Sequence, residues 1–202
     1  MRMNKDYFLN RAENYDGDKH RVENVSTIAN SIKQNVQFNK SMNIMDFGSG
    51  TGLLLEEIAP LVNKITAVDI SASMNGQLLA KKERLDCDLE ILDIDLTKKK
   101  LDKKFDGIIS SMTIHHIKDV KKLFQEFYSM LNPGGFIAIA DLDKEDGSFH
   151  TEDTGVFHFG FDRTEFLNFA ADAGFINLNI LSASISYQPN GEYPVFLLTG
   201  YK

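Results

Sequence analysis

An apolar segment that runs directly into a glycine-rich turn limits the folds open to this chain. Residues 43–47 read as a short buried strand, and Gly48-Ser49-Gly50-Thr51-Gly52 follows at once and opens a helix that runs to about residue 59. Strand, glycine turn and helix in this order are typical of the first unit of an α/β sheet that binds a ligand at its strand ends.

Short apolar runs alternate with helical patterns from about residue 42 onward. We expect strands at 43–47, 65–69, 89–92, 105–111 and 136–141. Further helices are expected after an N-cap at Ser71, over 119–131, and from Asp162 to Gly174. This alternation predicts βαβ units that build a parallel sheet.

The last residues of the chain follow a different pattern. Two strand-like runs, 175–187 and 193–201, are joined by Gln188-Pro189-Asn190-Gly191, which has the composition of a turn. Because nothing helical separates the runs, we expect them to pair antiparallel. The predicted fold is therefore a mostly parallel α/β sheet that ends in a hairpin.

Composition excludes several classes of protein. The 202 residues are 43% hydrophobic and 25% charged, which fits one globular domain over 1–202. The net charge of −7 argues against binding to nucleic acid or anionic membrane. A single cysteine, Cys87, cannot form an internal disulfide. With no apolar segment long enough to span a membrane and no signal-like start, we expect a cytoplasmic protein.

The glycine turn and a later carboxylate point to a nucleoside cofactor. Glycines permit positive φ and close approach of a ligand, and the free N–H groups of the following helix favour polar ligand groups. Asp69, at the end of the second strand, lies where an acidic side chain accepts hydrogen bonds from ribose hydroxyls. The dinucleotide pattern G-x-G-x-x-G fails, because position 53 is Leu53.

Six segments in order resemble class I S-adenosylmethionine-dependent methyltransferases, especially the small ubiquinone- and menaquinone-biosynthesis type. The matching segments are 11–16, 46–52, 68–74, 105–116, 131–135 and 160–175, and the terminal hairpin is similar too. The resemblance implies a Rossmann-like, seven-stranded sheet in the order 3-2-1-4-5-7-6 with helices on both faces. It also implies N-terminal cap helices within 1–40, and S-adenosylmethionine as cofactor with S-adenosylhomocysteine as product.

The resemblance also implies roles for individual residues. Gly48, Ser49, Gly50 and Gly52 would pass under the methionine part of the cofactor, and Asp46 would reach its ammonium. Asp69 would hold the ribose, Ile70 and Met74 would enclose the adenine, and Asp95, favoured over Asp93, would accept from the adenine amino group. The backbone of Ser110 would contact the ammonium, and Tyr15 would close over the cofactor. These assignments place carboxylates beside a cationic cofactor, which suits S-adenosylmethionine better than a pyrophosphate.

Three histidines are candidates for a catalytic base. Methyl transfer from a sulfonium depends mainly on positioning and on exclusion of water, and it needs a base only if the acceptor must lose a proton. His115 and His116 follow the fourth strand at the ligand-binding edge, and His158 lies in a segment, 143–161, that we expect to cover the substrate. Each could instead have a structural role.

The remaining expectations concern the acceptor, metals and rival functions. The fourth strand ends in Ser110-Ser111-Met112, unlike nucleic-acid amino-methylating enzymes, so we expect a small-molecule acceptor and O- or C-directed transfer.

The spacing of Asp141, Asp143, Glu145 and Glu152 is wrong for a calcium loop, and no metal site is predicted. The rivals are an NAD-dependent oxidoreductase and a binding module without catalysis.

Overall fold

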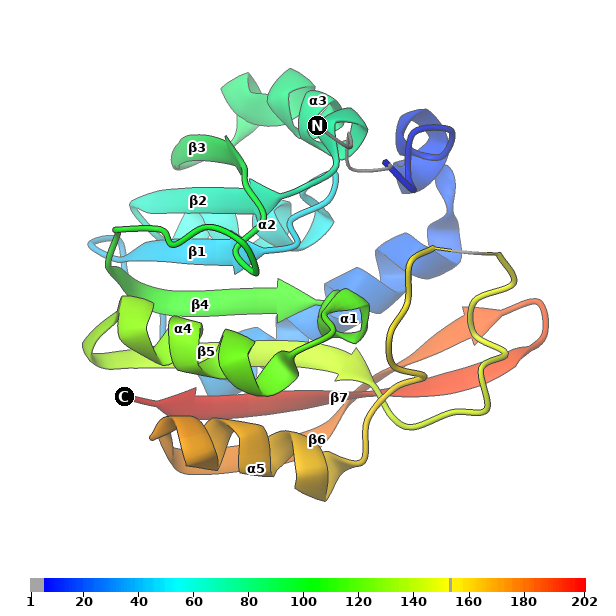
Figure 1. Cartoon of the computed structure of the whole chain (residues 1–202). Helices are drawn as coiled ribbons and strands as arrows, with labels where there is room; N and C mark the ends of the chain where they lie inside the picture. Colours follow the sequence, from blue (N-terminus) through cyan, green and yellow to red (C-terminus); the bar gives the residue numbers. More distant parts are fainter. Residues whose placement is uncertain (1–5, 153) are drawn as a thin grey trace.

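A seven-stranded sheet forms the centre of the computed structural model, which describes residues 6–152 and 154–202 (Figure 1). The expected cap region 1–40 and covering segment 143–161 therefore lie partly outside the described residues. The strands are β1 Asn43–Phe47, β2 Lys64–Asp69, β3 Asp88–Asp93, β4 Phe105–Ser111, β5 Leu131–Leu142, β6 Ile176–Gln188 and β7 Gly191–Tyr201.

The order of the strands is β3-β2-β1-β4-β5-β7-β6. Strands β1 to β5 pair in parallel, whereas β7 is antiparallel to both β5 and β6. This confirms the expected strand order and the terminal hairpin. Since β1, β2, β4 and β5 are parallel, their carboxyl ends meet at one edge of the sheet, and residues from several strands can converge there.

Helices cover both faces of the sheet. The helices are α1 Lys19–Asn35, α2 Leu53–Ile58, α3 Ala72–Lys81, α4 Val120–Met130 and α5 Arg163–Ala173, with short 3-10 helices η1 Ala12–Gly17, η2 Ala59–Leu61, η3 Lys82–Arg84 and η4 Ile114–His116. Helices α1, α2 and α3 contribute Ile28, Leu55 and Leu78 to one core. Helices α4 and α5 contribute Phe124 and Phe166 to a second core on the other face (Figure 1).

Side-chain caps fix several helix ends as the sequence predicts. The hydroxyl of Ser71 accepts from Met74 N at 3.2 Å at the start of α3. The carboxylate of Asp162 accepts from Thr164 N and Glu165 N at the start of α5. Gly174 ends α5 at a φ of 107°, a conformation that glycine adopts without a steric penalty. The α3 cap matters for the site, because it holds the chain that leaves β2.

The junction of α4 and β5 differs from the expectation. The helix ends at Met130, and β5 begins at Leu131 rather than at residue 136. Leu131 pairs with Phe105 at the start of β4, so the chain joins the sheet directly after the helix. The turn-like segment Asn132-Pro133-Gly134-Gly135 is thereby taken into an irregular start of β5, where the register between β4 and β5 shifts.

Candidate functional site

A cavity of about 1250 Å³ lies at the carboxyl ends of the parallel strands. Its wall combines the glycine turn after β1, the end of β2, the η4 region after β4, the N-terminal segment from Asp6 to Arg21, and part of the segment 149–157. The lining includes most of the residues predicted for the cofactor: Tyr15, Asp46, Gly48, Ser49, Gly50, Asp69, Ile70, Met74 and Asp95. Residues far apart in the sequence thus share one site.

Two glycines of the turn serve different steric needs. Gly48 has a φ of +70°, and a Cβ there would lie 2.1 Å from Thr113, whose hydroxyl donates to Gly48 O at 3.3 Å. Gly50 has a φ of +53°, and a Cβ there would meet nothing within 4 Å among the described residues. Gly48 therefore permits contact with the chain before η4, while Gly50 leaves open space at the cavity wall.

Two carboxylates stand beside the glycine turn. Oδ2 of Asp69 accepts from Gly50 N and Oδ1 accepts from Ser71 N, both at 2.8 Å. Asp46 is 1% exposed, and its Oδ2 has no hydrogen-bond partner among the residues that the structure describes. Burial, together with the charge of Asp69, raises the pKa of Asp46 to about 8. The cavity therefore presents an acidic wall with an unsatisfied oxygen.

The predicted adenine contacts lie on the same side of the cavity. Met74 is buried in the first turn of α3, whereas Ile70 is half exposed. Asp95 lies at the cavity wall, where it accepts from Thr97 N and from Lys98, while Asp93 is exposed at the end of β3. Burial opposes the charge of Asp95, but these contacts outweigh it and lower the pKa of its carboxyl.

Gly52 and Ser110 lie outside the cavity lining. Gly52 begins α2 at a φ of +89°, and a Cβ there would come within 2.5 Å of Leu78 Cδ1, so this glycine permits packing of α2 against α3. Ser110 is fully buried, and its hydroxyl donates to Phe47 O at 2.7 Å, which links β4 to β1. Its neighbour Ser111 lines the cavity instead.

The N-terminal segment closes one side of the cavity. Tyr15, in η1, lies beneath the guanidinium of Arg21 at 4.0 Å and meets Phe8 edge to face. Burial raises the pKa of the Tyr15 hydroxyl, so it stays protonated. Asp16 bonds to Thr51 in the glycine turn at 2.6 Å. This segment is thus fastened directly to the turn that it faces.

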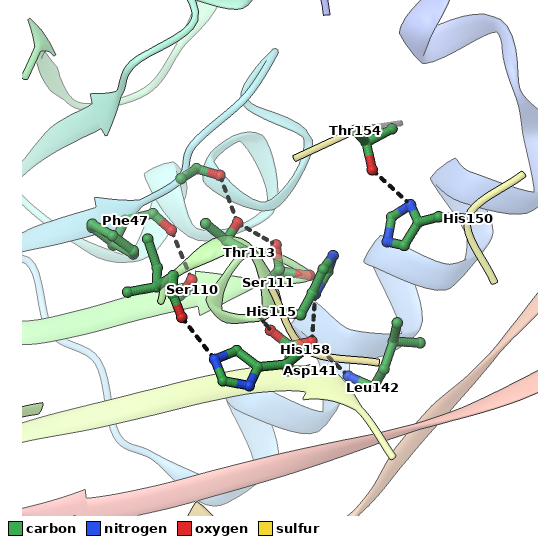
Figure 2. A network of polar contacts seen from close by, with 12 residues as sticks. Phe47, Ser110, Ser111, Thr113, His115, Asp141, Leu142, His150, Thr154 and His158 are labelled. Carbon is green, nitrogen blue, oxygen red and sulfur yellow. Dashed lines mark hydrogen bonds and ion pairs between the residues drawn. The ribbon is translucent and has the colours of Figure 1, made fainter. Parts of the chain in front are cut away.

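A buried Asp–His pair joins β5 to the end of β4. Nδ1 of His115 lies 2.6 Å from Oδ1 of Asp141, and Oδ2 of Asp141 accepts from the backbone N of His115 at 3.2 Å (Figure 2). Burial opposes the charge of Asp141, yet His115 and the backbone donors hold the pKa of Asp141 below its usual value. The carboxylate therefore fixes both the backbone and the ring of His115.

The other histidines lie in unlike surroundings. His116 and His150 line the cavity, and burial together with neighbouring imidazoles lowers the pKa of His116 to about 3 and that of His150 to about 4. Both rings are therefore neutral at pH 7. His158 is turned elsewhere, and its Nε2 bonds to Ile117 O at 2.9 Å (Figure 2). Of the three predicted bases, His115 and His116 reach the cavity.

Sequence reasoning gave no site role to Asp141 or His150. Asp141 ends the predicted strand 136–141, which is expected to lie next to the strand that precedes His115. A carboxylate at the end of a strand was the sequence signal that could have identified Asp141 as a site residue. In the sequence, Asp141 was considered only as one of four acidic residues with calcium-loop-like spacing. The structure gives these four residues separate partners. Asp143 bonds to Arg163, Glu145 to backbone N–H groups, and Glu152 to Arg11 at 2.5 Å. His150 carried no spacing signal, because the fold alone brings it near η4.

Comparison with known proteins agrees with this geometry. A family profile described as a methyltransferase domain matches residues 19–178. The chain belongs to the methyltransferase-domain family. This confirms the family that the sequence motifs resemble.

Individual members of the family cover the chain to different extents. An uncharacterised methyltransferase of Schizosaccharomyces pombe is 27% identical over 184 residues, which is 83% of this chain and 64% of that protein. A ubiquinone biosynthesis O-methyltransferase of Pelagibacter ubique is 30% identical over 107 residues, or 52% of this chain and 44% of that protein. The chain thus spans less than two thirds of the length of these two relatives.

A solved structure shares the fold over nearly its full length. The N-methyltransferase NodS of Bradyrhizobium japonicum, in complex with S-adenosylhomocysteine, superposes with a TM-score of 0.74 at 12% identity. The match covers 98% of this chain and 99% of NodS. Among the described residues, no helix of this methyltransferase-family chain is long and apolar enough to cross a membrane.

Proposed function

We propose that this protein transfers a methyl group from S-adenosylmethionine to a small-molecule acceptor. The unsatisfied carboxylate oxygen of Asp46 is the observation that carries the proposal. A buried acceptor without a donor is costly, and an ammonium group on a bound ligand would relieve that cost. A pyrophosphate has no cationic group to pair with Asp46 and would lie beside the carboxylate of Asp69, which disfavours the NAD-dependent alternative.

The chain supplies groups for each part of the cofactor. The open space at Gly50 and the Oγ of Ser49, which has no partner among the described residues, face the position proposed for the methionine part. Asp69 is oriented by two backbone donors, and its oxygens retain acceptor capacity for ribose hydroxyls. Met74 and Ile70 would enclose the adenine, and Asp95 would accept from its amino group. When bound, the cofactor supplies the electrophilic methyl group.

The acceptor would lie between the glycine turn and the histidines. Thr113 joins these two parts, because its hydroxyl contacts Gly48 O and it stands two residues before His115. His115, held by Asp141, is then the imidazole placed to take a proton from an acceptor that must lose one. His116, with its pKa near 3, would be a weak base at pH 7.

Two segments would exclude water from the reaction. Residues 149–152 and 154–157 line one side of the cavity, the N-terminal segment from Asp6 to Arg21 lines another, and Glu152 binds Arg11 between them. Exclusion of water favours displacement at the sulfonium over hydrolysis and strengthens electrostatic contacts within the site. We propose that these segments, within a single domain over 1–202, select a small acceptor.

Ligand binding separates the proposed cofactor from a dinucleotide. Thermal unfolding would be measured with S-adenosylhomocysteine and, separately, with NAD. A ligand that binds only the folded state raises its stability by mass action, so S-adenosylhomocysteine should raise the melting temperature and NAD should not. Stabilisation by NAD alone would contradict the proposal.

Turnover separates an enzyme from a binding module. The protein would be incubated with S-adenosylmethionine carrying a labelled methyl group and with a metabolite extract. We expect label in a small molecule, and in none when protein heated beyond unfolding is used. Tight binding of S-adenosylhomocysteine with no label transferred across extracts would support the module instead.

A further inference from the structure

Three imidazoles meet at the rim of the proposed acceptor position. His115 and His116 come from η4, and His150 comes from the segment that covers the cavity. The ring centroids are 4.3 Å apart for His115 and His116, 5.1 Å for His115 and His150, and 5.6 Å for His116 and His150. One nitrogen from each ring can be chosen so that all three lie within 4.8 Å of one another.

We propose that His115, His116 and His150 form a binding site for a divalent transition-metal ion such as Zn²⁺. Three imidazoles are a ligand set that suits zinc, copper, iron and nickel. A tetrahedral zinc ion with Zn–N distances of 2.0–2.1 Å would hold its ligand nitrogens about 3.3 Å apart. The nitrogens therefore need to approach by up to about 1.5 Å, and His150 lies outside helices and strands.

Each of the three imidazole rings already has a polar partner. Asp141 holds Nδ1 of His115 at 2.6 Å, and the hydroxyl of Thr154 lies 3.1 Å from Nδ1 of His150 (Figure 2). The backbone of Gly155 hydrogen-bonds His116. Metal-binding histidines typically bond through their other nitrogen to a carboxylate, a carbonyl or another polar group, which fixes the ring for coordination. His115 and His150 have such a partner at Nδ1, which leaves their Nε2 atoms to bind an ion.

The free nitrogen of His150 adds an independent indication of a ligand. Nε2 of His150 is buried and has no hydrogen-bond partner among the described residues. Burying such an atom without a partner costs free energy, and a metal ion would satisfy it.

The site faces the cavity and leaves a coordination position for a further ligand. His115, His116 and His150 all line the same cavity as the glycine turn. Three protein ligands with an open fourth position are typical of catalytic zinc sites. If the proposed methyl transfer holds, an oxygen or sulfur atom of the acceptor is the class of ligand that fits this position. Asp141 holds Nδ1 of His115, so only Nε2 is left either to bind the ion or to act as a base. With the ion bound, the ion would therefore activate the acceptor in place of His115.

Cobalt titration of the full chain without an affinity tag tests the site. Co²⁺ bound by three imidazoles in a four-coordinate site gives intense visible absorption, and Zn²⁺ should displace it. We expect one equivalent of Co²⁺ per chain. His150→Ala should weaken binding more than about 100-fold, because even loss of an outer-shell partner costs about 10–100-fold. Asp141→Asn should weaken it by about 10–100-fold.

His20→Ala is the matched control. His20 lies on α1 with its ring beside Tyr187 and neither lines the cavity nor belongs to the cluster, so this variant should bind Co²⁺ as the unaltered chain does. Circular dichroism would verify that each variant is folded. Equal affinity in His150→Ala and the unaltered chain would overturn the metal site, as would a spectrum typical of six-coordinate Co²⁺. Neither result bears on S-adenosylhomocysteine binding, so the proposed function is tested separately.

Discussion

The two halves of the cavity are built in different ways. The glycine-turn half comes from the ends of β1 and β2, where residues 46–51 and Asp69 line the wall. The histidine half combines η4, Asp141 from β5 and His150 from a long connecting segment. In the first half local sequence determines the geometry, whereas in the second half the tertiary fold does.

The energetics of the two halves also differ. The glycine-turn half is unsatisfied: Asp46 Oδ2 and Ser49 Oγ lack partners among the residues described. The histidine half is mixed: Asp141 is satisfied by His115 and by the backbone N of Leu142 at 2.7 Å, whereas Nε2 of His150 lacks a partner among the described residues. We therefore infer that the first half gains free energy when a ligand binds, while Asp141 contributes to stability before any ligand is present.

Asp141→Ala tests the histidine half and should have the largest effect. Removing one partner of a buried, hydrogen-bonded pair typically costs about 3–5 kcal/mol, because the remaining donors lose their acceptor. We expect the free energy of unfolding, measured with urea, to fall by this amount. Asp172→Ala is the control: its ion pair with Lys121 is exposed, and it should cost about 0–1 kcal/mol. An equal loss of unfolding free energy in both variants would show that the buried pair stabilises the fold no more than an exposed ion pair does.

Asp69→Ala tests the glycine-turn half. A hydrogen bond to a charged group contributes about 1.5–3 kcal/mol, so affinity for S-adenosylhomocysteine should fall about tenfold or more. Isothermal titration calorimetry would measure the dissociation constant. Asp88→Ala is the matched control, since Asp88 is an exposed carboxylate at the opposite end of the neighbouring strand β3. Unchanged affinity in Asp69→Ala would contradict the role given to Asp69.

The difference between locally determined and fold-determined geometry also explains which features could be predicted from the sequence. The strand order, the hairpin and the caps at Ser71 and Asp162 follow from local patterns and from family resemblance, and the structure confirms them. The start of β5 was predicted wrongly, because pairing of Leu131 with Phe105 overrides a turn-like sequence. The convergence of His150 on His115 could not be foreseen, since no local pattern relates residues joined only by tertiary packing.

Paired glycine variants separate ligand contact from packing within the glycine-turn half. Gly50→Ala and Gly52→Ala share the strain of a positive φ, about 1–2 kcal/mol. Only Gly52→Ala also presses on Leu78, which should cost about 1–3 kcal/mol more in unfolding free energy. Gly50→Ala places its methyl group at the cavity wall and should weaken S-adenosylhomocysteine binding more. The reverse order of affinities would place the ligand elsewhere.

Asp46→Asn should have the smallest effect and the most specific pH dependence. The pKa of Asp46 rises from 3.8 to about 8 on folding, so between these values the folded protein keeps a proton that the unfolded chain releases. The stability of the ligand-free protein therefore falls as pH rises through this window. Asp46→Asn removes the ionisation and should flatten that part of the profile, so the variant should be the more stable of the two proteins near pH 8.

Thermal unfolding between pH 5 and pH 9 would measure the pH dependence of stability, both without a ligand and with S-adenosylmethionine bound. The ligand should favour the ionised carboxylate, because its ammonium supplies the missing partner. Binding to the unaltered chain at pH 7 should accordingly release a proton, and binding to Asp46→Asn should be weaker and release less. A variant that is less stable than the unaltered chain at pH 8 would show that Asp46 is satisfied without a ligand. The two halves of the cavity would then not differ in the way inferred above.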